Sequence, residues 1–144
     1  MRLNIRNASL RDSEFLSELA YQLGYKTSTE NIQERLTEII NNQDHCIYVV
    51  EDNENVIGWI HAFKTLRVES ETAVEIGGMV VKENYRSKGI GKALIEKIIE
   101  WSLKKGLMRI RVRCNSVRQE TPKFYEKLGF VEIKEQRIFD KKIR

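Results

Sequence analysis

The chain has 144 residues, of which 41% are hydrophobic and 32% are charged, and its formal net charge is +4. This composition predicts a globular protein of one domain that buries its own core without metal or disulfide support. No apolar run is long enough to span a bilayer and the N-terminus has no signal-peptide core, so we expect no membrane association and a cytoplasmic location.

The charge is unevenly divided along the chain. Residues 1–84 contain 8 Lys and Arg against 14 Asp and Glu, a net charge of −6, whereas residues 85–144 contain 17 against 7, a net charge of +10. A basic half suits a polyanionic ligand and an acidic half suits a cationic one. An uneven spread of charge over solvated faces is the alternative for the N-terminal part.

The first 42 residues predict a strand and two helices. Leu3 and Ile5 indicate the strand, and the pattern Ser9-x-x-Asp12 is typical of a helix start. Apolar residues then recur at helical spacing over 15–23 and end at Gly24, a suitable C-terminal cap. A second amphipathic helix lies between Ser28-Thr29-Glu30 and Asn41-Asn42.

Three strands should follow. Residues 46–50 and 56–63 are rich in β-branched residues and flank a polar turn, which predicts a hairpin, and residues 74–81 form a third apolar run. We expect these three strands to be antiparallel neighbours. His61 stands alone among apolar residues of its strand, so packing is a better interpretation for it than catalysis.

Directly after the third of these strands comes the most informative segment, with the sequence Arg86-Ser87-Lys88-Gly89-Ile90-Gly91-Lys92. A helix that begins at two close glycines presents unpaired N–H groups, partial positive charge and no side chains at the closest approach. Arg86, Lys88 and Lys92 add full charges, so the segment predicts a site for phosphate or pyrophosphate. A glycine-rich turn that only begins a helix is the alternative.

Two familiar phosphate loops do not fit this segment. Gly91-Lys92 is followed by Ala93, so the hydroxyl that holds magnesium in a P-loop is missing. Leu94 stands where the dinucleotide-binding fingerprint needs a third glycine.

A helix after this loop carries apolar residues on a broad stripe and ends at Lys104-Lys105-Gly106. The strand expected over 107–114 then alternates apolar residues with Arg109, Arg111 and Arg113. No aromatic residues are interleaved to stack on bases, so a nucleic-acid surface is not favoured, and a solvated face or a contact in a homodimer are the alternatives.

The C-terminal part predicts one more helix and two closing strands. Thr121-Pro122 is typical of a helix start, Gly129 ends the helix, and residues 130–133 and 137–139 have strand-like composition. Cys46 and Cys114 have no metal-ligand spacing, and we expect them to be reduced core residues. No metal site is indicated.

The segment around Arg86, Gly89 and Gly91 resembles the pyrophosphate-binding signature of the Gcn5-related N-acetyltransferase (GNAT) family, Gln/Arg-x-x-Gly-x-Gly/Ala. Residues 80–85 before it and the run Phe124-Tyr125-Glu126-Lys127-Leu128-Gly129-Phe130 resemble further landmarks of that family. The resemblance implies an α/β fold in a single domain over 1–144. Its mixed, largely antiparallel twisted sheet would have about seven strands flanked by about four helices, in the order β-α-α-β-β-β-α-β-α-β-β.

The same resemblance implies acetyl-CoA as co-substrate and an amine as acceptor. The pantetheine arm would pair with the backbone of Met79, Val80 and Val81. The pyrophosphate would be held by the loop that follows, which consists of Arg86, Ser87, Lys88, Gly89, Ile90, Gly91 and Lys92. Tyr125 would protonate the leaving thiolate, and Asn115 would bond the cofactor's amide chain. Pro122 and the long 116–120 segment depart from the family pattern, so the transfer to Asn115 is weaker than to Tyr125.

Glu75 is the residue expected to act as general base, because an alkyl amine with a pKa of about 10 must lose a proton before it attacks. It is the sole acid of its apolar strand, and alternation would place it on one face with Gly77, Met79 and Val81. A salt bridge to one of the three arginines is the alternative for Glu75, and an aromatic plug is the alternative for Tyr125.

The function that this resemblance implies, with Glu75 and Tyr125 as base and acid, is direct transfer of an acetyl group from acetyl-CoA to a primary amine of a small molecule or protein, in a ternary complex. The alternative is a regulatory module that binds acyl-CoA and transfers nothing. The presence of both Glu75 and Tyr125 favours the enzyme, because a sensor has no use for an acid and a base.

Overall fold

The computed structural model describes residues 2–22, 24–114 and 120–144, which divide into two compact units, Met1–Val112 and Arg113–Arg144. The first unit is built on one sheet in which the strands follow one another in the order β1-β2-β3-β4-β5. The strands are β1 (Leu3–Asn7), β2 (His45–Asp52), β3 (Asn55–Thr65), β4 (Ala73–Val81) and β5 (Ile110–Val112). Neighbours among the first four are antiparallel, and β5 runs parallel to β4, so the sheet is mixed as expected.

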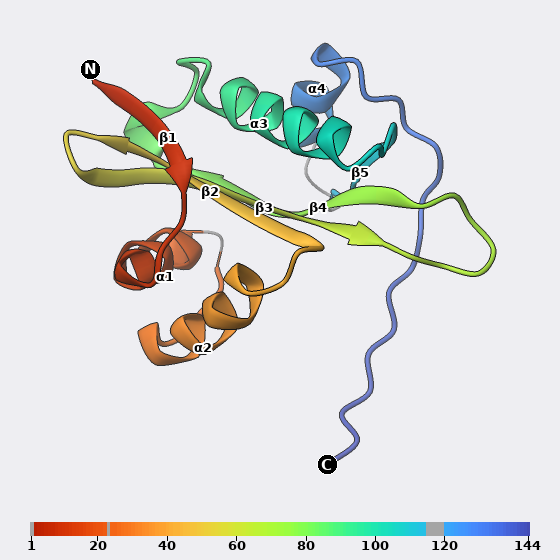
Figure 1. Ribbon diagram of the computed structural model, residues 1–144, viewed down its shortest axis with the longest axis horizontal. Coiled ribbons are helices and arrows are strands. Elements are labelled where there is room, and N and C mark those ends of the chain that lie inside the picture. The colour runs from red at the N-terminus through yellow and green to blue at the C-terminus, as the bar shows by residue number, and fades with distance from the viewer. Residues whose placement is uncertain (1, 23, 115–119) are drawn as a thin grey trace. The chain divides into compact units, whose positions relative to one another are not determined.

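Helices cover both faces of this sheet. The helices α1 and α2 lie on one face and α3 lies on the other (Figure 1). The helical elements of this unit are η1 (Leu10–Asp12), α1 (Ser13–Gln22), α2 (Thr29–Ile40), η2 (Glu83–Tyr85) and α3 (Ile90–Lys104). None of the helices among the described residues is long and apolar enough to cross a membrane.

The predicted helix boundaries are confirmed by their caps. The Ser9 backbone N–H donates to Asp12 Oδ2 at 2.8 Å, and the turn continues directly into α1. Gly24 follows α1 with a φ of +87°, a left-handed conformation that glycine adopts without strain. At the start of α2 the Ser28 hydroxyl accepts a hydrogen bond from the Asn31 N–H at 3.1 Å.

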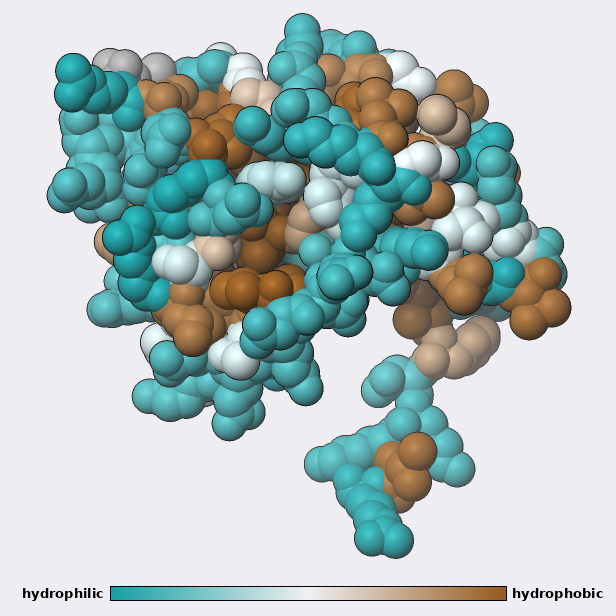
Figure 2. Space-filling model, viewed as in Figure 1, coloured by the Kyte–Doolittle hydropathy of each residue, from teal (hydrophilic) through white to brown (hydrophobic). Residues whose placement is uncertain are grey.

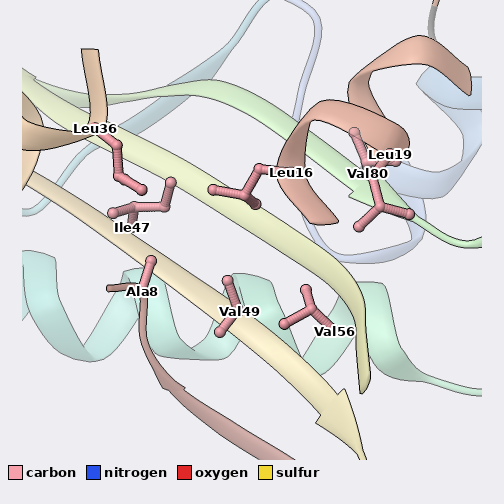
Figure 3. Close-up of a cluster of buried hydrophobic side chains, with 8 residues drawn as sticks. All are labelled: Ala8, Leu16, Leu19, Leu36, Ile47, Val49, Val56 and Val80. Carbon is pink, nitrogen blue, oxygen red and sulfur yellow. The ribbon is translucent and has the colours of Figure 1, made fainter. Parts of the chain in front are cut away.

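The core between the sheet and the helices α1 and α2 is aliphatic. Figure 3 shows its buried members, which come from both helices, from three strands and from the residue that follows β1: Ala8, Leu16, Leu19, Leu36, Ile47, Val49, Val56 and Val80. On the other face, Leu94, Ile95 and Ile98 of α3 are almost fully buried. The apolar stripe that the sequence shows on this helix is therefore its sheet-facing side.

Three charged residues join β1, η1 and β2. Arg6 donates to both oxygens of the buried Asp12 carboxylate at 2.8 and 2.9 Å, and its Nε donates to Glu51 at 3.2 Å. Burial alone would raise the pKa of Asp12, but the hydrogen bonds from Arg6 and from the Ser9 N–H outweigh it, so that pKa is lowered. This network fixes the first strand and the entry to α1.

The hairpin prediction is confirmed. Asn53 and Glu54 have φ values of +50° and +75°, as a two-residue hairpin turn with the twist of the strands requires. The turn sets the pairing of Asp52 with Asn55 and of Glu51 with Val56. An irregularity between Val50 and Glu51 then shifts the pairing by one residue, so that His45 lies opposite Phe63.

The second unit contains α4 (Glu120–Lys127), which begins one residue before the predicted cap Thr121, and it contains no regular strand among its described residues. The expectation of about seven strands was therefore wrong, because the described residues form five, and the runs 130–133 and 137–139 are not strands. Their apolar side chains are exposed, for example Val131 and Phe139, and Figure 2 shows hydrophobic atoms open to view along this segment.

The physical reason is that strand-like composition is only a local preference, whereas a strand needs a neighbouring edge that supplies its hydrogen bonds. The same reason applies to β5, which covers only Ile110–Val112 of the strand predicted over 107–114, since its ladder with β4 is confined to that stretch.

Candidate active site

The loop between β4 and α3 has the geometry of an anion site. Ser87 and Gly89 both adopt positive φ values, of +63° and +79°, and Gly89 is the N-cap of α3. The first helical hydrogen bond runs from Ala93 N–H to the Gly89 carbonyl at 3.1 Å. The N–H groups of Ile90, Gly91 and Lys92 therefore have no acceptor within the helix and are available to a ligand.

The loop is accessible and positively charged. A Cβ built on Gly89 would meet no atom within 4 Å, so a bulky anion can approach the backbone there. The side chains of Arg86, Lys88 and Lys92 are exposed, and the first turn of α3 holds no acidic residue. Ile90 is buried, so it can offer a ligand only its backbone. Pyrophosphate fits this arrangement of donors and charges.

Interactions with the sheet fix the beginning of this loop. The Tyr85 hydroxyl donates to Asp52 Oδ2 at 2.6 Å, and Arg86 Nε donates to the Val81 carbonyl at 3.3 Å. The Lys88 ammonium lies 5.9 Å from the centroid of the Tyr85 ring. The loop is thus held in place before any ligand arrives.

The last residues of β4 have an open edge. Strand β5 pairs with β4 only from Val74 to Ile76, so from Gly77 onward the described residues supply no partner on that side. The Lys82 N–H points to β3, where it donates to Ile57 at 2.8 Å. By alternation the N–H groups of Met79 and Val81 point to the open edge, where an extended ligand can pair with them. Val80 is buried in the core and can contribute only its backbone.

Strand β4 has a β-bulge at Gly77. His61 pairs with Gly78, whereas the next residue Ala62 pairs with Ile76, so Gly77 is an extra residue in β4. Such a residue leaves the ladder locally disrupted.

The bulge overturns one expectation about the site. Glu75 lies opposite Phe63 and Met79 lies opposite Ile60, and these two β3 residues point to different faces. Glu75 therefore does not share a face with Met79 and Val81, as simple alternation predicts. It shares the α1/α2 face with Gly78 and Val80.

Glu75 itself is half-buried, with 13% of its side chain exposed. Its carboxylate lies 3.9 Å from Arg67, and its position pairs with Arg111 of β5. Arg67 is a partner that the sequence alone does not single out. In the arginine row, Arg109 pairs with Glu71 at 3.2 Å.

Two histidines lie beside the bulge, and the sequence analysis did not recognise them as a pair. The nitrogens His45 Nδ1 and His61 Nε2 are 2.9 Å apart, and the two rings stack with centroids 5.2 Å apart. Phe63 stacks on His45 with centroids 5.3 Å apart. The hairpin turn alone was not a sufficient signal, because the register shifts by one residue between Val50 and Glu51. That shift pairs Ile47 with His61 and His45 with Phe63, which places the two histidines on one face.

In the second unit, Tyr125 is buried between two aromatic rings. Phe124 and Phe130 meet it edge to face, with centroid distances of 5.1 and 5.3 Å. Burial, with a smaller effect of Cys114, raises the pKa of the Tyr125 hydroxyl to about 12. Tyr125 is therefore protonated at any physiological pH. Asn115 lies outside the described residues.

A further hollow opens between α1 and α2. It is lined by Ser17, Glu18, Tyr21, Lys26, Thr27 and Ser28. Ser17 donates to the Thr27 carbonyl at 3.0 Å and fixes the wall of the hollow. Within the described residues, no group of three or more His, Cys, Asp or Glu side chains could hold a metal ion.

The sequence profile of the Acetyltransferase (GNAT) family matches residues 11–130. The chain belongs to this family. The match includes the loop, the bulged strand and the helix that carries Tyr125.

Individual proteins agree with this assignment. The chain is 30% identical over 148 aligned positions to the uncharacterized N-acetyltransferase CT2212 of Chlorobaculum tepidum, covering 96% of this chain and 81% of the relative. It is 33% identical over 88 positions to N-acetylaspartate synthetase of Xenopus tropicalis, covering 61% of this chain and 31% of the relative. This chain thus spans about a third of that synthetase.

Among solved structures, AAC(6′)-Iy in complex with the bisubstrate analogue CoA-S-monomethyl-acetylneamine superimposes with a TM-score of 0.87. The two share 20% identity and the alignment covers 99% of each chain. At this identity the similarity shows the α/β fold of the family.

Proposed function

We propose that this protein transfers the acetyl group of acetyl-CoA to a primary amine by direct attack in a ternary complex. The observation that carries the proposal is the continuity of two features. The open edge of β4 ends where the loop at Gly89 begins, so an extended arm on Met79 and Val81 leads to a pyrophosphate on the α3 N-terminus. Coenzyme A has this sequence of groups, and the solved relative AAC(6′)-Iy was crystallised with CoA.

In this proposal the backbone holds the thioester and the side chains move protons. A backbone N–H at the bulged part of β4 stabilises the carbonyl oxygen as it becomes negative. Glu75 takes a proton from the ammonium group of the acceptor, directly or through a water, so that the nitrogen can attack. Tyr125 gives its proton to the sulfur as the C–S bond breaks, and the acceptor nitrogen supplies the proton that restores it.

The acceptor is an amine of a small molecule or a protein. The hollow at Glu18 and Tyr21 lies between the two helices that precede β2, in the acidic half of the chain, and supports a cationic acceptor. The solved relative in complex with a CoA-neamine conjugate supports a polyamine-like molecule as one candidate.

The remaining parts of the proposal concern organisation. We take residues 1–144 as one catalytic domain that includes both compact units, with Asn115 bonding the amide chain of the cofactor. Both cysteines are free thiols, which supports a reducing, cytoplasmic environment. The row Arg109, Arg111 and Arg113 supports a homodimer contact, which light scattering tests.

The deciding experiment is an acceptor screen with acetyl-CoA and release of free thiol as the readout. The panel should include aminoglycosides, amino sugars, polyamines and lysine peptides. We expect at least one primary amine to raise thiol release well above the rate of acetyl-CoA hydrolysis. Binding of acetyl-CoA without thiol release for any amine would replace the enzyme with a silent acyl-CoA-binding module. Failure to bind acetyl-CoA would reject both.

A further inference from the structure

The histidine pair beside the β4 bulge has no role in the reaction as described so far. His61 Nδ1 lies 2.8 Å from the position that a Cβ on Gly77 would occupy, so the imidazole edge is directly against the bulged backbone. Phe63 is also close, at 3.0 Å from the same position. Glycine at 77 is therefore what allows an imidazole nitrogen to reach the part of β4 where the thioester is proposed to lie.

The two rings form a continuous hydrogen-bonded path. His61 Nε2 is 2.9 Å from His45 Nδ1, and in one arrangement the Nε2–H of His61 donates to the bare Nδ1 of His45. His61 then has a bare Nδ1 facing Gly77, and His45 has an Nε2–H on its far side. His45 is at the first position of β2 and is only half-buried, so the path begins at the bulge and ends near solvent.

We propose that His61 and His45 form a proton relay that carries the proton lost by the acceptor amine from the bulge to solvent. This inference rests on the proposed acetyl transfer. It adds two side chains from β2 and β3 to a reaction otherwise assigned to Glu75 and Tyr125.

The protons balance as follows. An ammonium acceptor brings two protons that must leave its nitrogen as the N–C bond forms and the C–S bond breaks. One of them ends on the sulfur by way of Tyr125. The other passes to His61 Nδ1, directly or after Glu75 has accepted it, while His61 Nε2–H moves to His45 and His45 Nε2–H moves to water. Both rings finish neutral with their other nitrogen protonated, and ring rotation restores the starting arrangement.

The electrostatic environment of His61 favours a ring that passes a proton on over a ring that stays protonated. Burial, and to a lesser extent the neighbouring His45, lowers the pKa of His61 to about 4, so its ring is neutral and ready to accept at working pH. Charged groups on this face include Glu75, which lies opposite Phe63, its ion-pair partner Arg67, and Arg111, which pairs with Glu75 in the sheet. A relay does not need to hold charge, since each proton arrives as another departs.

The first test needs no acceptor. Nitrogen-15 correlation spectra of the histidine rings report which nitrogen carries the proton in each. We expect His61 to be neutral at pH 7, with Nε2 protonated and Nδ1 bare. A His61 ring protonated at Nδ1, with its lone pair turned to His45, overturns the inference because no acceptor then faces the bulge.

The second test is kinetic and uses acetyl-CoA with the best amine from the screen. We expect kcat/KM to fall about 100-fold in His61→Gln and about tenfold in His45→Gln, with the acetyl-CoA Kd unchanged. In mixtures of light and heavy water, the dependence of the rate on the deuterium fraction should indicate that more than one proton is in flight in the parent. The same measurement should indicate fewer protons in flight in His45→Gln than in the parent. The matched control is Lys64→Gln, which removes an exposed charge from the same strand and should keep parental kinetics.

The outcomes separate the two levels of the proposal. Parental kcat/KM and an unchanged isotope response in both histidine variants overturn the relay and leave acetyl transfer intact. If His61→Gln does not fold, the relay is still tested by the kinetics of His45→Gln, a change at a half-buried position, and by the ring spectra of the parent. If the parent acetylates no amine, the proposed function fails as well, and the kinetic arm then counts against the relay.

Discussion

The Tyr85 hydroxyl donates a hydrogen bond of 2.6 Å to Asp52 Oδ2, which ties the start of the loop between β4 and α3 to the end of β2. The hydrogen bond to Asp52 raises the pKa of Tyr85, and it lowers the pKa of Asp52 together with the Arg2 backbone N–H. The bond therefore links two residues 33 positions apart and orders the loop in the absence of ligand.

The first prediction concerns this bond. Tyr85→Phe should weaken acetyl-CoA binding about three- to tenfold, because the loop must then be ordered at the expense of binding free energy. Calorimetric titration measures the change. Tyr21→Phe is a matched control on an exposed tyrosine of α1 and should leave the Kd unchanged. An unchanged Kd in Tyr85→Phe means that the remaining contacts are enough to order the loop.

The second prediction separates charge from backbone strain at Gly89. Asn and Asp both tolerate a positive φ better than other side chains, so Gly89→Asn tests strain and bulk, and Gly89→Asp adds a negative charge where the pyrophosphate is proposed to bind. We expect acetyl-CoA affinity to fall about 100-fold in Gly89→Asp and much less in Gly89→Asn.

Gly106 offers the control for this experiment. It has a similar φ of +73°, and a Cβ there would also meet no atom within 4 Å, but it lies at the opposite end of α3. Gly106→Asp should therefore retain acetyl-CoA binding. Equal affinities for the parent and Gly89→Asp would contradict the assignment of the loop as the pyrophosphate site.

The third prediction tests Glu75 as the base. Glu75→Gln keeps the size of the side chain and removes its basicity, so kcat/KM should fall at least about tenfold. The limb on which log kcat/KM rises with pH should disappear. Melting temperature and acetyl-CoA Kd are measured beside the kinetics, because Glu75 also lies 3.9 Å from Arg67. A large loss of thermal stability with the pH limb retained would make Glu75 a structural partner of Arg67.

The fourth prediction concerns Tyr125. Tyr125→Phe keeps the ring between Phe124 and Phe130 and removes only the proton, so kcat should fall about 100-fold while the acetyl-CoA Kd stays the same. Because the pKa of Tyr125 is raised to about 12, ionisation of this residue should not limit activity below pH 10. Full turnover in Tyr125→Phe, under conditions where chemistry limits the rate, would leave the ring only a packing role.

The fifth prediction concerns stability. Asp12→Asn removes the charge that Arg6 holds at 2.8 Å and should lower the free energy of unfolding by about 2 kcal/mol. The pKa of Asp12 is lowered in the folded state, so its contribution is complete above the unfolded pKa of about 4 and is lost as pH falls toward the folded pKa.

Denaturant titrations at pH 7 and at about pH 3 measure both effects, and the difference between the parent and Asp12→Asn should shrink at the lower pH. Glu14→Gln, an exposed acid in the first turn of α1, is the control and should change stability little. A constant difference at both pH values would mean that the charge of Asp12 is not what stabilises this corner.

Much of the molecule was determined by sequence alone, because the relevant forces act between neighbours along the chain. Caps such as Ser9 and Gly24, the hairpin turn at Asn53 and the amphipathic stripe of α3 are local features, and the structure has each of them. The loop at Gly89 was predictable for the same reason, since a helix start creates its own unpaired N–H groups.

Tertiary structure decided what depends on pairing between distant segments. Simple alternation along residues 74–81 predicted that Glu75 and Met79 share a face, but the bulge at Gly77 places them on opposite faces. The runs 130–133 and 137–139 have the composition of strands in the sequence, yet neither of them is a strand in the structure. His45 and His61 are unremarkable separately, and only the hairpin register brings their nitrogens to 2.9 Å, because hydrogen-bonded strand pairing fixes which side chains meet.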